Sequence, residues 1–127
     1  MEALTCWARE GKYYEVVEKG LNPLTEFFGA FRANIPLAGA VDTEFNVKLK
    51  EELEMYDVIW LAGEAKSHCV ANTLGQLFDY PEVVRRLVIL EDCMSNISGC
   101  EDLAIPIYEK AARMGARFET SESLLFA

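Results

Sequence analysis

Residues 58–74 read VIWLAGEAKSHCVANTL, and this stretch decides the fold. It begins with an apolar run, continues through a glycine-led loop, and ends in a helical pattern that opens on Cys69 and Val70. A short apolar run followed by a glycine loop and a helix is typical of the strand–loop–helix unit of a parallel α/β sheet. The thiol of Cys69 is therefore predicted on the first turn of a helix, at the carboxyl end of a buried strand, where ligands gather in such sheets.

The position of Cys69 supports more than one interpretation. A helix N-terminus stabilises the thiolate, which is the nucleophilic form of cysteine, so Cys69 is a candidate nucleophile. Free cysteine is also a common small core residue, which is the structural alternative. A third possibility is a redox-sensing thiol, although the spacing of Cys6, Cys93 and Cys100 singles out no partner for it.

The rest of the chain alternates between strand and helix patterns. Strands are predicted over residues 13–18, 57–62, 87–90 and 116–120. Helices are predicted over residues 1–10, 25–31, 45–56 (capped by Asp42 or Thr43), 67–78 (capped by Ser67) and 102–114, the last ended by Gly115. This order predicts a single α/β domain over 1–127 with a mostly parallel sheet and right-handed crossovers.

The composition indicates an acidic globular protein. The 127 residues carry a formal net charge of −9, and 51% of them are hydrophobic, which suffices for one domain with a packed core. The acidic charge argues against nucleic acid and anionic membranes as partners. No apolar run approaches the roughly 20 residues of a membrane span.

The cysteine and histidine content bears on metal binding and on the cellular compartment. The four cysteines show neither a CxxC pair nor zinc-ligand spacing, and the chain has one histidine. A histidine-based metal site is therefore not expected. A reduced, cytoplasmic protein is the simplest interpretation.

Other candidate site residues follow the predicted strands. Lys19 ends the first strand, so it is either a solvated lysine or a cation that acts on the thiol or on a developing oxyanion. Asp92 follows the third strand, and a turn or capping acid is the preferred interpretation over a general base. Phe28 and Phe31 belong to an aromatic cluster, for which core packing is preferred over a wall for a planar substrate.

Residues 63–70, GEAKSHCV, followed by Asn72 and Thr73, resemble the nucleophile loop of nicotinamidase and related cysteine hydrolases of the isochorismatase-like superfamily. That loop usually reads Gly-x-Ala-x-x-x-Cys-Val. The segments EKG (18–20), LEDC (90–93) and GARF (115–118) resemble the family's lysine-bearing strand end, the strand after the nucleophile and the closing strand. The resemblance covers nearly the whole chain in the same order, and it implies a Rossmann-like three-layer fold.

The same resemblance implies an amidase that cleaves the C–N bond of a small amide, of which nicotinamide is the commonest example. Cys69 would be the nucleophile and would form a thioester acyl-enzyme. Lys19 would be the second member of an Asp-Lys-Cys triad. The backbone N–H groups of Ala65 and Cys69 would form the oxyanion hole, and the Glu64–Ala65 peptide bond would be cis.

The chain also departs from the family pattern. The family's triad Asp and its metal ligands, an Asp and two His that often bind a divalent metal such as zinc, would precede Met1, as would the first two strands. The chain is therefore expected to be truncated at its N-terminus, with no cofactor held by its own residues. The alternative function is a catalytically incomplete or binding-only relative. Because missing central strands expose a sheet edge, a homo-oligomer is expected.

Overall fold

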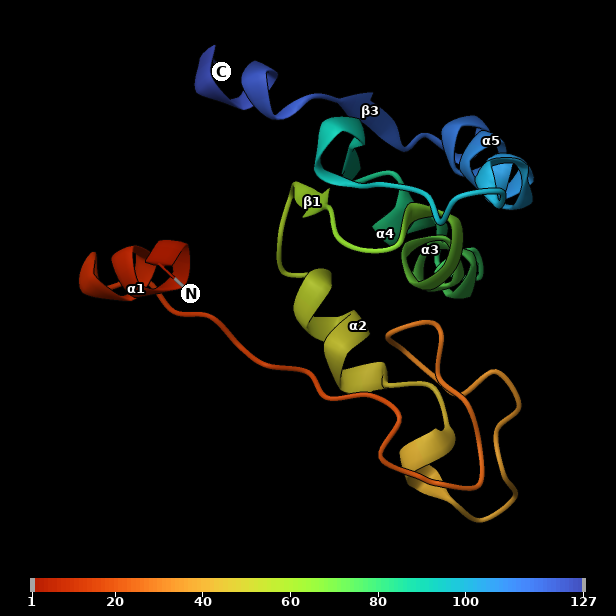
Figure 1. Cartoon of the computed structure of the whole chain (residues 1–127). Helices are drawn as coiled ribbons and strands as arrows, with labels where there is room; N and C mark the ends of the chain where they lie inside the picture. Colours follow the sequence, from red (N-terminus) through yellow and green to blue (C-terminus); the bar gives the residue numbers. More distant parts are fainter. Residues whose placement is uncertain (1, 127) are drawn as a thin grey trace.

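The sheet of the protein is built from the two apolar runs of the sequence and a third, more polar strand. The computed structural model describes residues 2–126, with side chains over 5–123. Strands β1 (Ile59–Leu61), β2 (Leu87–Leu90) and β3 (Arg117–Glu119) form a three-stranded sheet in the order β1-β2-β3. Both pairs are parallel, so the chain has an α/β, Rossmann-like fold (Figure 1).

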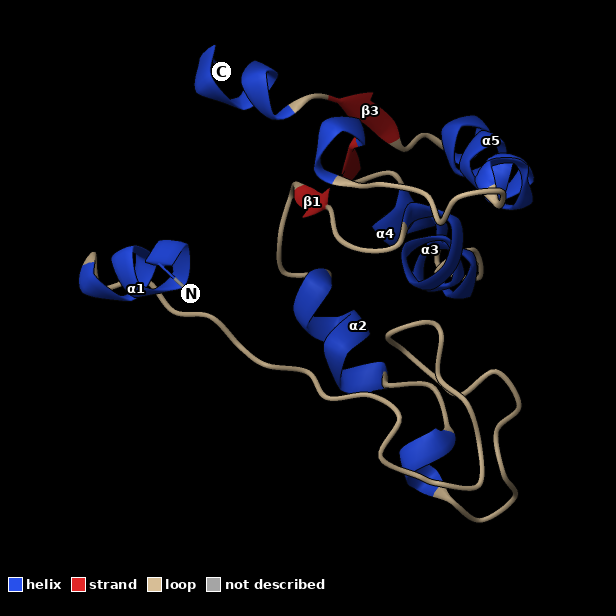
Figure 2. Cartoon of the chain, viewed as in Figure 1, coloured by secondary structure: helices blue, strands red, loops and turns tan. Residues whose placement is uncertain are grey.

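Helices connect the parallel strands and pack against the sheet. The connection from β1 to β2 contains α3 (Ala71–Gln76) and α4 (Pro81–Val84), and the connection from β2 to β3 contains α5 (Ile105–Met114). These three helices lie together beside the strands (Figure 2). The remaining α-helices are α1 (Glu2–Arg9) and α2 (Val47–Leu53). Short 3-10 helices are η1 (Val41–Thr43), η3 (Glu91–Cys93), η4 (Glu101–Ala104) and η5 (Ser121–Phe126), and η2 (Lys66–Val70) is a π-helix.

The core lies between β2 and these helices. All four residues of β2 are buried, as the continuous apolar run predicts, and its Leu87 and Ile89 pack in one cluster with Leu74, Val83 and Ala111. Burial of such side chains is the main favourable contribution to folding, at roughly 25 cal/mol per Å² of apolar surface. β2 is the central strand, so it is covered on both sides by its neighbours.

Helix α5 ends where the sequence predicts. Gly115 adopts a φ of 104°, a left-handed conformation that side chains disfavour, and its N–H donates to the carbonyl groups of Ala111 and Ala112. The start of the helix differs from the prediction, because Asp102 lies in η4 and no side chain caps α5.

The strand predicted over 13–18 is wrong. These residues form neither helix nor strand, so the sheet has three strands where four were predicted. The sequence is rich in aromatic and β-branched residues, but a strand is stable only when it pairs with a neighbour. No strand lies beside this segment among residues 2–126.

The helix predicted over 25–31 is also absent, because side chains elsewhere bind its backbone. The N–H of Ala30 donates to Thr73 Oγ1 at 3.0 Å, and the N–H of Phe31 donates to Gln76 Oε1 at 3.0 Å. The N–H of Phe28 donates to Asn34 Oδ1. These partners replace the carbonyl groups that a helix would offer, so the segment forms turns docked on α3.

Three smaller differences separate the predicted elements from the observed ones. The predicted cap of the helix over 45–56 is wrong, since Asn46 caps α2 by accepting from the N–H of Leu49 at 3.0 Å. α4 was not predicted, although Pro81 suits the first position of a helix. β1 was predicted to be buried, yet Trp60 is 61% exposed, because β1 is an edge strand.

None of the helices in the described part of the chain has the length and apolar character of a membrane span.

Candidate active site

Cys69 lies where the sequence predicts, just beyond the carboxyl end of β1. The chain leaves β1, passes Gly63 at a φ of 135°, and enters η2, which continues directly into α3. The first turn is a π-helix, since the N–H of Val70 donates to the carbonyl of Ala65 at 3.2 Å. Cys69 is half-buried, and its thiol forms no disulfide.

The loop before Cys69 is attached to the loop after β2. The N–H of Gly63 donates to the carbonyl of Cys93 at 3.3 Å, and the N–H of Lys66 donates to the carbonyl of Ser95 at 2.8 Å. In return, the N–H and hydroxyl of Ser95 donate to the Glu64 carboxylate at 3.3 and 2.9 Å. These bonds orient the peptide groups that precede the thiol.

A second set of contacts holds the turn itself. Ser67 is buried, and its hydroxyl oxygen accepts from the N–H of Ile97 at 3.0 Å and lies 2.9 Å from His68 Nδ1. The predicted cap at Ser67 is therefore wrong, because the hydroxyl accepts from a backbone N–H of a distant loop and not from one of its own helix. The phenol of Tyr108 donates to the carbonyl of Lys66 at 2.9 Å.

The carbonyl of Cys69 is also bound. Thr73 Oγ1 donates to it at 2.8 Å and accepts from the N–H of Ala30 at 3.0 Å. The side-chain amide of Asn72 donates to the carbonyl of His68 at 2.8 Å. The turn carrying the thiol is thus fixed by α3, by the 25–31 loop and by the loop after β2.

Two backbone features of the loop bear on the resemblance, and the first of them agrees with it. The Glu64–Ala65 peptide bond is cis. Within the described residues, the N–H of Ala65 donates to no hydrogen-bond acceptor. A free N–H four residues before the thiol is available to a ligand.

Lys19 is not where the sequence places it. Because residues 13–18 form no strand, Lys19 does not lie at the carboxyl edge of the sheet. Its ammonium group donates to the carbonyl groups of Phe28 at 2.6 Å and Phe27 at 3.3 Å. No hydrogen bond or ion pair joins Lys19 to Cys69 in the part of the chain that the structure describes.

The two phenylalanines do not form one substrate wall. Phe31 is 3% exposed and stacks on Phe45 with ring centroids 5.1 Å apart, so it belongs to the core. Phe28 is 40% exposed and is absent from this core cluster. The preferred interpretation, core packing, describes Phe31.

Asp92 has a structural role in this protein. Its carboxylate accepts from the N–H of Ser121 at 2.8 Å and from the Ser121 hydroxyl at 2.5 Å, which ties η3 to η5. The hydrogen bond from the Ser121 hydroxyl is the main cause of a lowered pKa of Asp92, and the bond from the Ser121 N–H adds to it. Both bonds stabilise the charged carboxylate. The geometry therefore agrees with a turn acid, and it leaves the thiol without Asp92 as a base.

Replacing Ser121 by alanine is expected to raise the pKa of Asp92. A lowered pKa contributes stability above the ordinary carboxyl pKa, and that contribution is lost as the pH falls through the folded-state value. Ser121→Ala should therefore make the folded protein protonate Asp92 at higher pH. NMR titration of the carboxyl carbon measures this, with Ser98→Ala as control; an unchanged Asp92 titration in Ser121→Ala would contradict the assignment.

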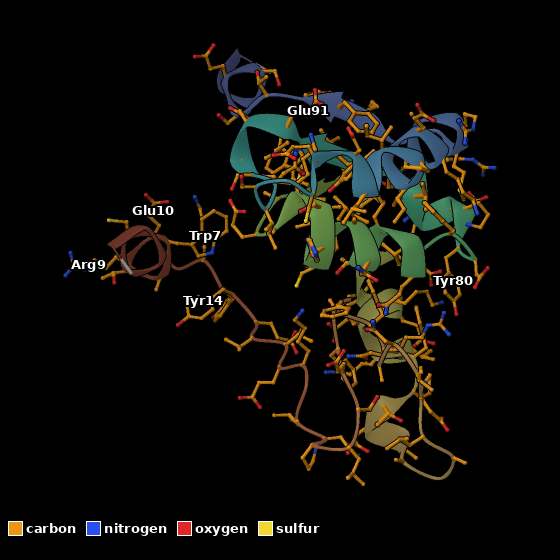
Figure 3. All side chains as sticks on the ribbon, turned by 45° about the vertical axis from the view of Figure 1, so that its right-hand side comes forward. Trp7, Arg9, Glu10, Tyr14, Tyr80 and Glu91 are labelled. Carbon is orange, nitrogen blue, oxygen red and sulfur yellow. The ribbon has the colours of Figure 1, made fainter. Side chains whose placement is uncertain are left out.

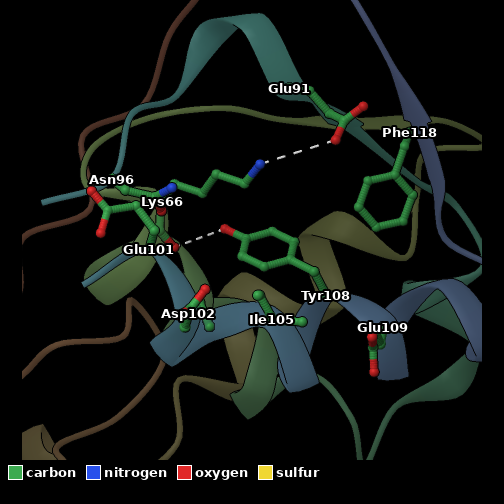
Figure 4. Close-up of a pocket in the computed structure, with 10 residues that line it drawn as sticks. Lys66, Glu91, Asn96, Glu101, Asp102, Ile105, Tyr108, Glu109 and Phe118 are labelled. Atoms are coloured by element: carbon green, nitrogen blue, oxygen red, sulfur yellow. Dashed lines mark hydrogen bonds and ion pairs between the residues drawn. The ribbon is translucent and has the colours of Figure 1, made fainter. Parts of the chain in front are cut away.

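A pocket of about 330 Å³ lies beside the cysteine loop (Figure 4). Lys66, from the loop, points across it toward Glu91, with 4.0 Å between Nζ and Oε1, and lies 5.3 Å from the centre of the Tyr108 ring. Phe118 from β3 forms another part of the wall. Three residues bond to the cysteine loop from distant parts of the chain: Ser95, Ile97 and Tyr108. Sequence patterns did not single them out because they lie far from Cys69 along the chain.

Replacing Tyr108 by phenylalanine is expected to lower stability by about 1–2 kcal/mol, because the carbonyl of Lys66 loses its donor. Burial raises the pKa of Tyr108 to about 12 from an ordinary value of 10.0. The unfolded chain therefore ionises first, so the contribution of Tyr108 is full below about pH 10 and is lost as the pH rises toward 12. Urea unfolding at pH 7 and above pH 10 measures the difference in free energy of unfolding between the wild type and Tyr108→Phe. This difference should be smaller above pH 10; an equal difference at both pH values would contradict the assignment.

The described residues provide no cluster of three or more His, Cys, Asp or Glu side chains that could hold a metal ion. All four cysteines are free. The site therefore consists of a half-buried thiol, a free backbone N–H and the hydrogen bonds that position them.

Comparison with known proteins gives a likeness of fold. No protein-family model matches the chain, and no curated protein matches it. Among solved structures, it is similar to a nicotinamidase/pyrazinamidase from Acinetobacter baumanii, with a TM-score of 0.50 and 17% sequence identity. The likeness covers 79% of this chain and 44% of that one, so the chain spans less than half the length of the solved structure. The protein shares the α/β fold of this nicotinamidase.

Proposed function

We propose that the protein is a cysteine hydrolase of nicotinamidase type, which cleaves the C–N bond of a small amide through a thioester on Cys69. The observation that carries the proposal is the placement of a free, half-buried thiol on the first turn after β1, in a loop held by hydrogen bonds from three other segments. The fold likeness to a nicotinamidase supports it. The four cysteines form no disulfide, which suits a reducing compartment, so we also propose a cytoplasmic location.

The reaction follows from the chemistry of the thiol. The sulfur of Cys69 attacks the amide carbonyl carbon, the C–N bond breaks, and the nitrogen leaves as ammonia with the proton of the thiol. Water then attacks the thioester, which releases the acid and restores the thiol. The free N–H of Ala65, with that of Cys69, would stabilise the oxyanion that develops in both steps.

Lys19 takes no part in the proposed reaction. Its ammonium group is bound to the carbonyl groups of Phe27 and Phe28, so a role beside Cys69 requires that these bonds break. We therefore assign the nucleophile and the oxyanion donors, and we leave Lys19 without a step.

The test is release of ammonia from nicotinamide, followed by a series of small amides and carbamoyl compounds. Intact-mass measurement after addition of each amide should detect the acyl group on Cys69, and added hydroxylamine should remove it as a hydroxamate. Ammonia release with an adduct on Cys69 supports the proposal. If no amide gives either product, the proposal fails, and the chain is a binding-only, catalytically incomplete relative.

A further inference from the structure

Strand β1 has an open edge. It pairs with β2 on one side, and no strand within residues 2–126 pairs with the other side. The apolar side chains in and just before it are exposed: Trp60 is 61%, Val58 46% and Tyr56 59% exposed. The stretch 57–62 contains no proline or lysine, the residues that natural proteins use to protect edge strands. Such an edge offers both backbone hydrogen-bonding groups and apolar surface to another strand.

The same chain contains an unpaired segment that is suited to pairing. Residues 12–18, KYYEVVE, form neither helix nor strand and are exposed, with Tyr13 95% and Val16 72% exposed. We call this segment the arm. Its aromatic and β-branched residues favour strand structure, and its apolar side chains have no cover in the monomer. Figure 3 shows Tyr14 on the arm and Trp7 on α1, where the indole N–H of Trp7 donates to the carbonyl of Tyr13 at 3.0 Å.

The arm lies away from the open edge of its own chain. Figure 1 shows it running from α1 past α2, separated from β1. Glu15 forms an ion pair with Lys48 of α2 at 3.7 Å, and Lys19 at the end of the arm is bound to the 25–31 loop. The arm and the edge therefore both lack a partner and do not meet within one chain.

We propose that the arm of one copy pairs with β1 of a second copy and extends its sheet. Two-fold symmetry lets both arms exchange at once, so each copy gives one strand and receives one. In a strand, alternate side chains face the same side, so Tyr14 and Val16 would lie together on one face, suited to packing beside Trp60. In this arrangement the partner is a second copy of the chain, and the interface is the outer edge of β1.

The first experiment measures the mass of the full chain in solution by light scattering over a concentration series. The wild type is expected to be a dimer, and Val16→Pro with Val17→Pro is expected to be a monomer over the same range. Proline cannot donate to a sheet, and one of two consecutive N–H groups in a strand always faces the paired edge. The arm has no helix or strand in the monomer, so the variant should still unfold cooperatively. Its midpoint should be lower than that of the wild-type dimer and should not depend on protein concentration, because association stabilises the folded wild type.

A matched control removes an exposed apolar side chain elsewhere. Leu103 in η4 is 64% exposed, and Leu103→Ser should leave the dimer intact. A monomeric wild type would overturn the proposal. A dimer that persists in the double proline variant would also overturn it, because two copies would then be pairing through another surface, such as β1 to β1.

Cross-linking identifies the partner segment. A photoreactive benzoylphenylalanine replaces Tyr14 in a tagged copy, which is mixed with an untagged, isotopically heavy copy. Cross-links from position 14 to residues 57–62 of the heavy chain are expected. Cross-links confined to the same chain, or to a different segment of the heavy chain, would overturn the proposal. Neither experiment depends on amide hydrolysis, so its outcome is separate from that of the proposed function.

Discussion

Cys69→Ala is expected to abolish amide hydrolysis, with a loss of at least about 10³-fold in rate, as removal of a nucleophile typically causes. The thiol is the one group to which the proposed mechanism assigns covalent chemistry, and alanine offers no atom that can form the thioester. Because the side chain is half-buried and its carbonyl keeps its bond from Thr73, the fold should be retained. Ammonia release and the mass of the acyl adduct measure the effect.

Cys93→Ala is the matched control for this experiment. Cys93 is an exposed free cysteine close to the same loop, where its carbonyl accepts from the N–H of Gly63. Alanine keeps that carbonyl, so activity should stay within about twofold of the wild type if Cys69 is the nucleophile. Equal ammonia release by the wild type and Cys69→Ala would show that the thiol carries no part of the reaction.

Leu74→Ala is expected to cause the largest loss of stability, about 2–5 kcal/mol. Leu74 is 0% exposed and lies on α3 in the core cluster with Leu77, Val84 and Ile89. Truncation removes buried apolar surface and leaves a cavity that the neighbouring side chains fill only in part. A domain of this size has a total stability of roughly 5–15 kcal/mol, so the variant should be close to unfolding.

Urea unfolding followed by circular dichroism measures this loss, and Leu103→Ala is its control. The two substitutions remove the same atoms, but Leu103 is 64% exposed and should change stability by less than about 0.5 kcal/mol. A loss below about 1 kcal/mol for Leu74→Ala would mean that α3 does not form the core described here.

Prediction from sequence succeeded where a local pattern of residues is compatible with one structure only. The run 87–90 is apolar throughout, and it forms the fully buried β2. Gly115 ends α5 because its left-handed φ suits glycine. The strand–loop–helix unit around Cys69 follows from the order of apolar run, glycine and helical segment, and the structure has all three parts.

Prediction failed where a segment depends on distant partners. The arm has a strand-forming composition but no neighbour to pair with, so its residues stay outside the sheet. The 25–31 segment has a helical pattern, but Thr73 and Gln76 take its N–H groups. In both cases tertiary contacts, or their absence, override a local preference that is worth only a fraction of a kcal/mol per residue.

The sequence by itself determined the fold class, the buried strand over 87–90 and the position of the thiol after β1, because apolar periodicity and glycine stereochemistry act within a few residues. Only the tertiary structure decided which groups surround that thiol. Ser95, Ile97 and Tyr108 reach the loop from positions that are far apart along the chain, and Lys19 binds the carbonyl groups of Phe27 and Phe28 instead. Hydrogen bonds of this kind depend on how the connections between strands pack against the cysteine loop. No local pattern in the sequence encodes that packing.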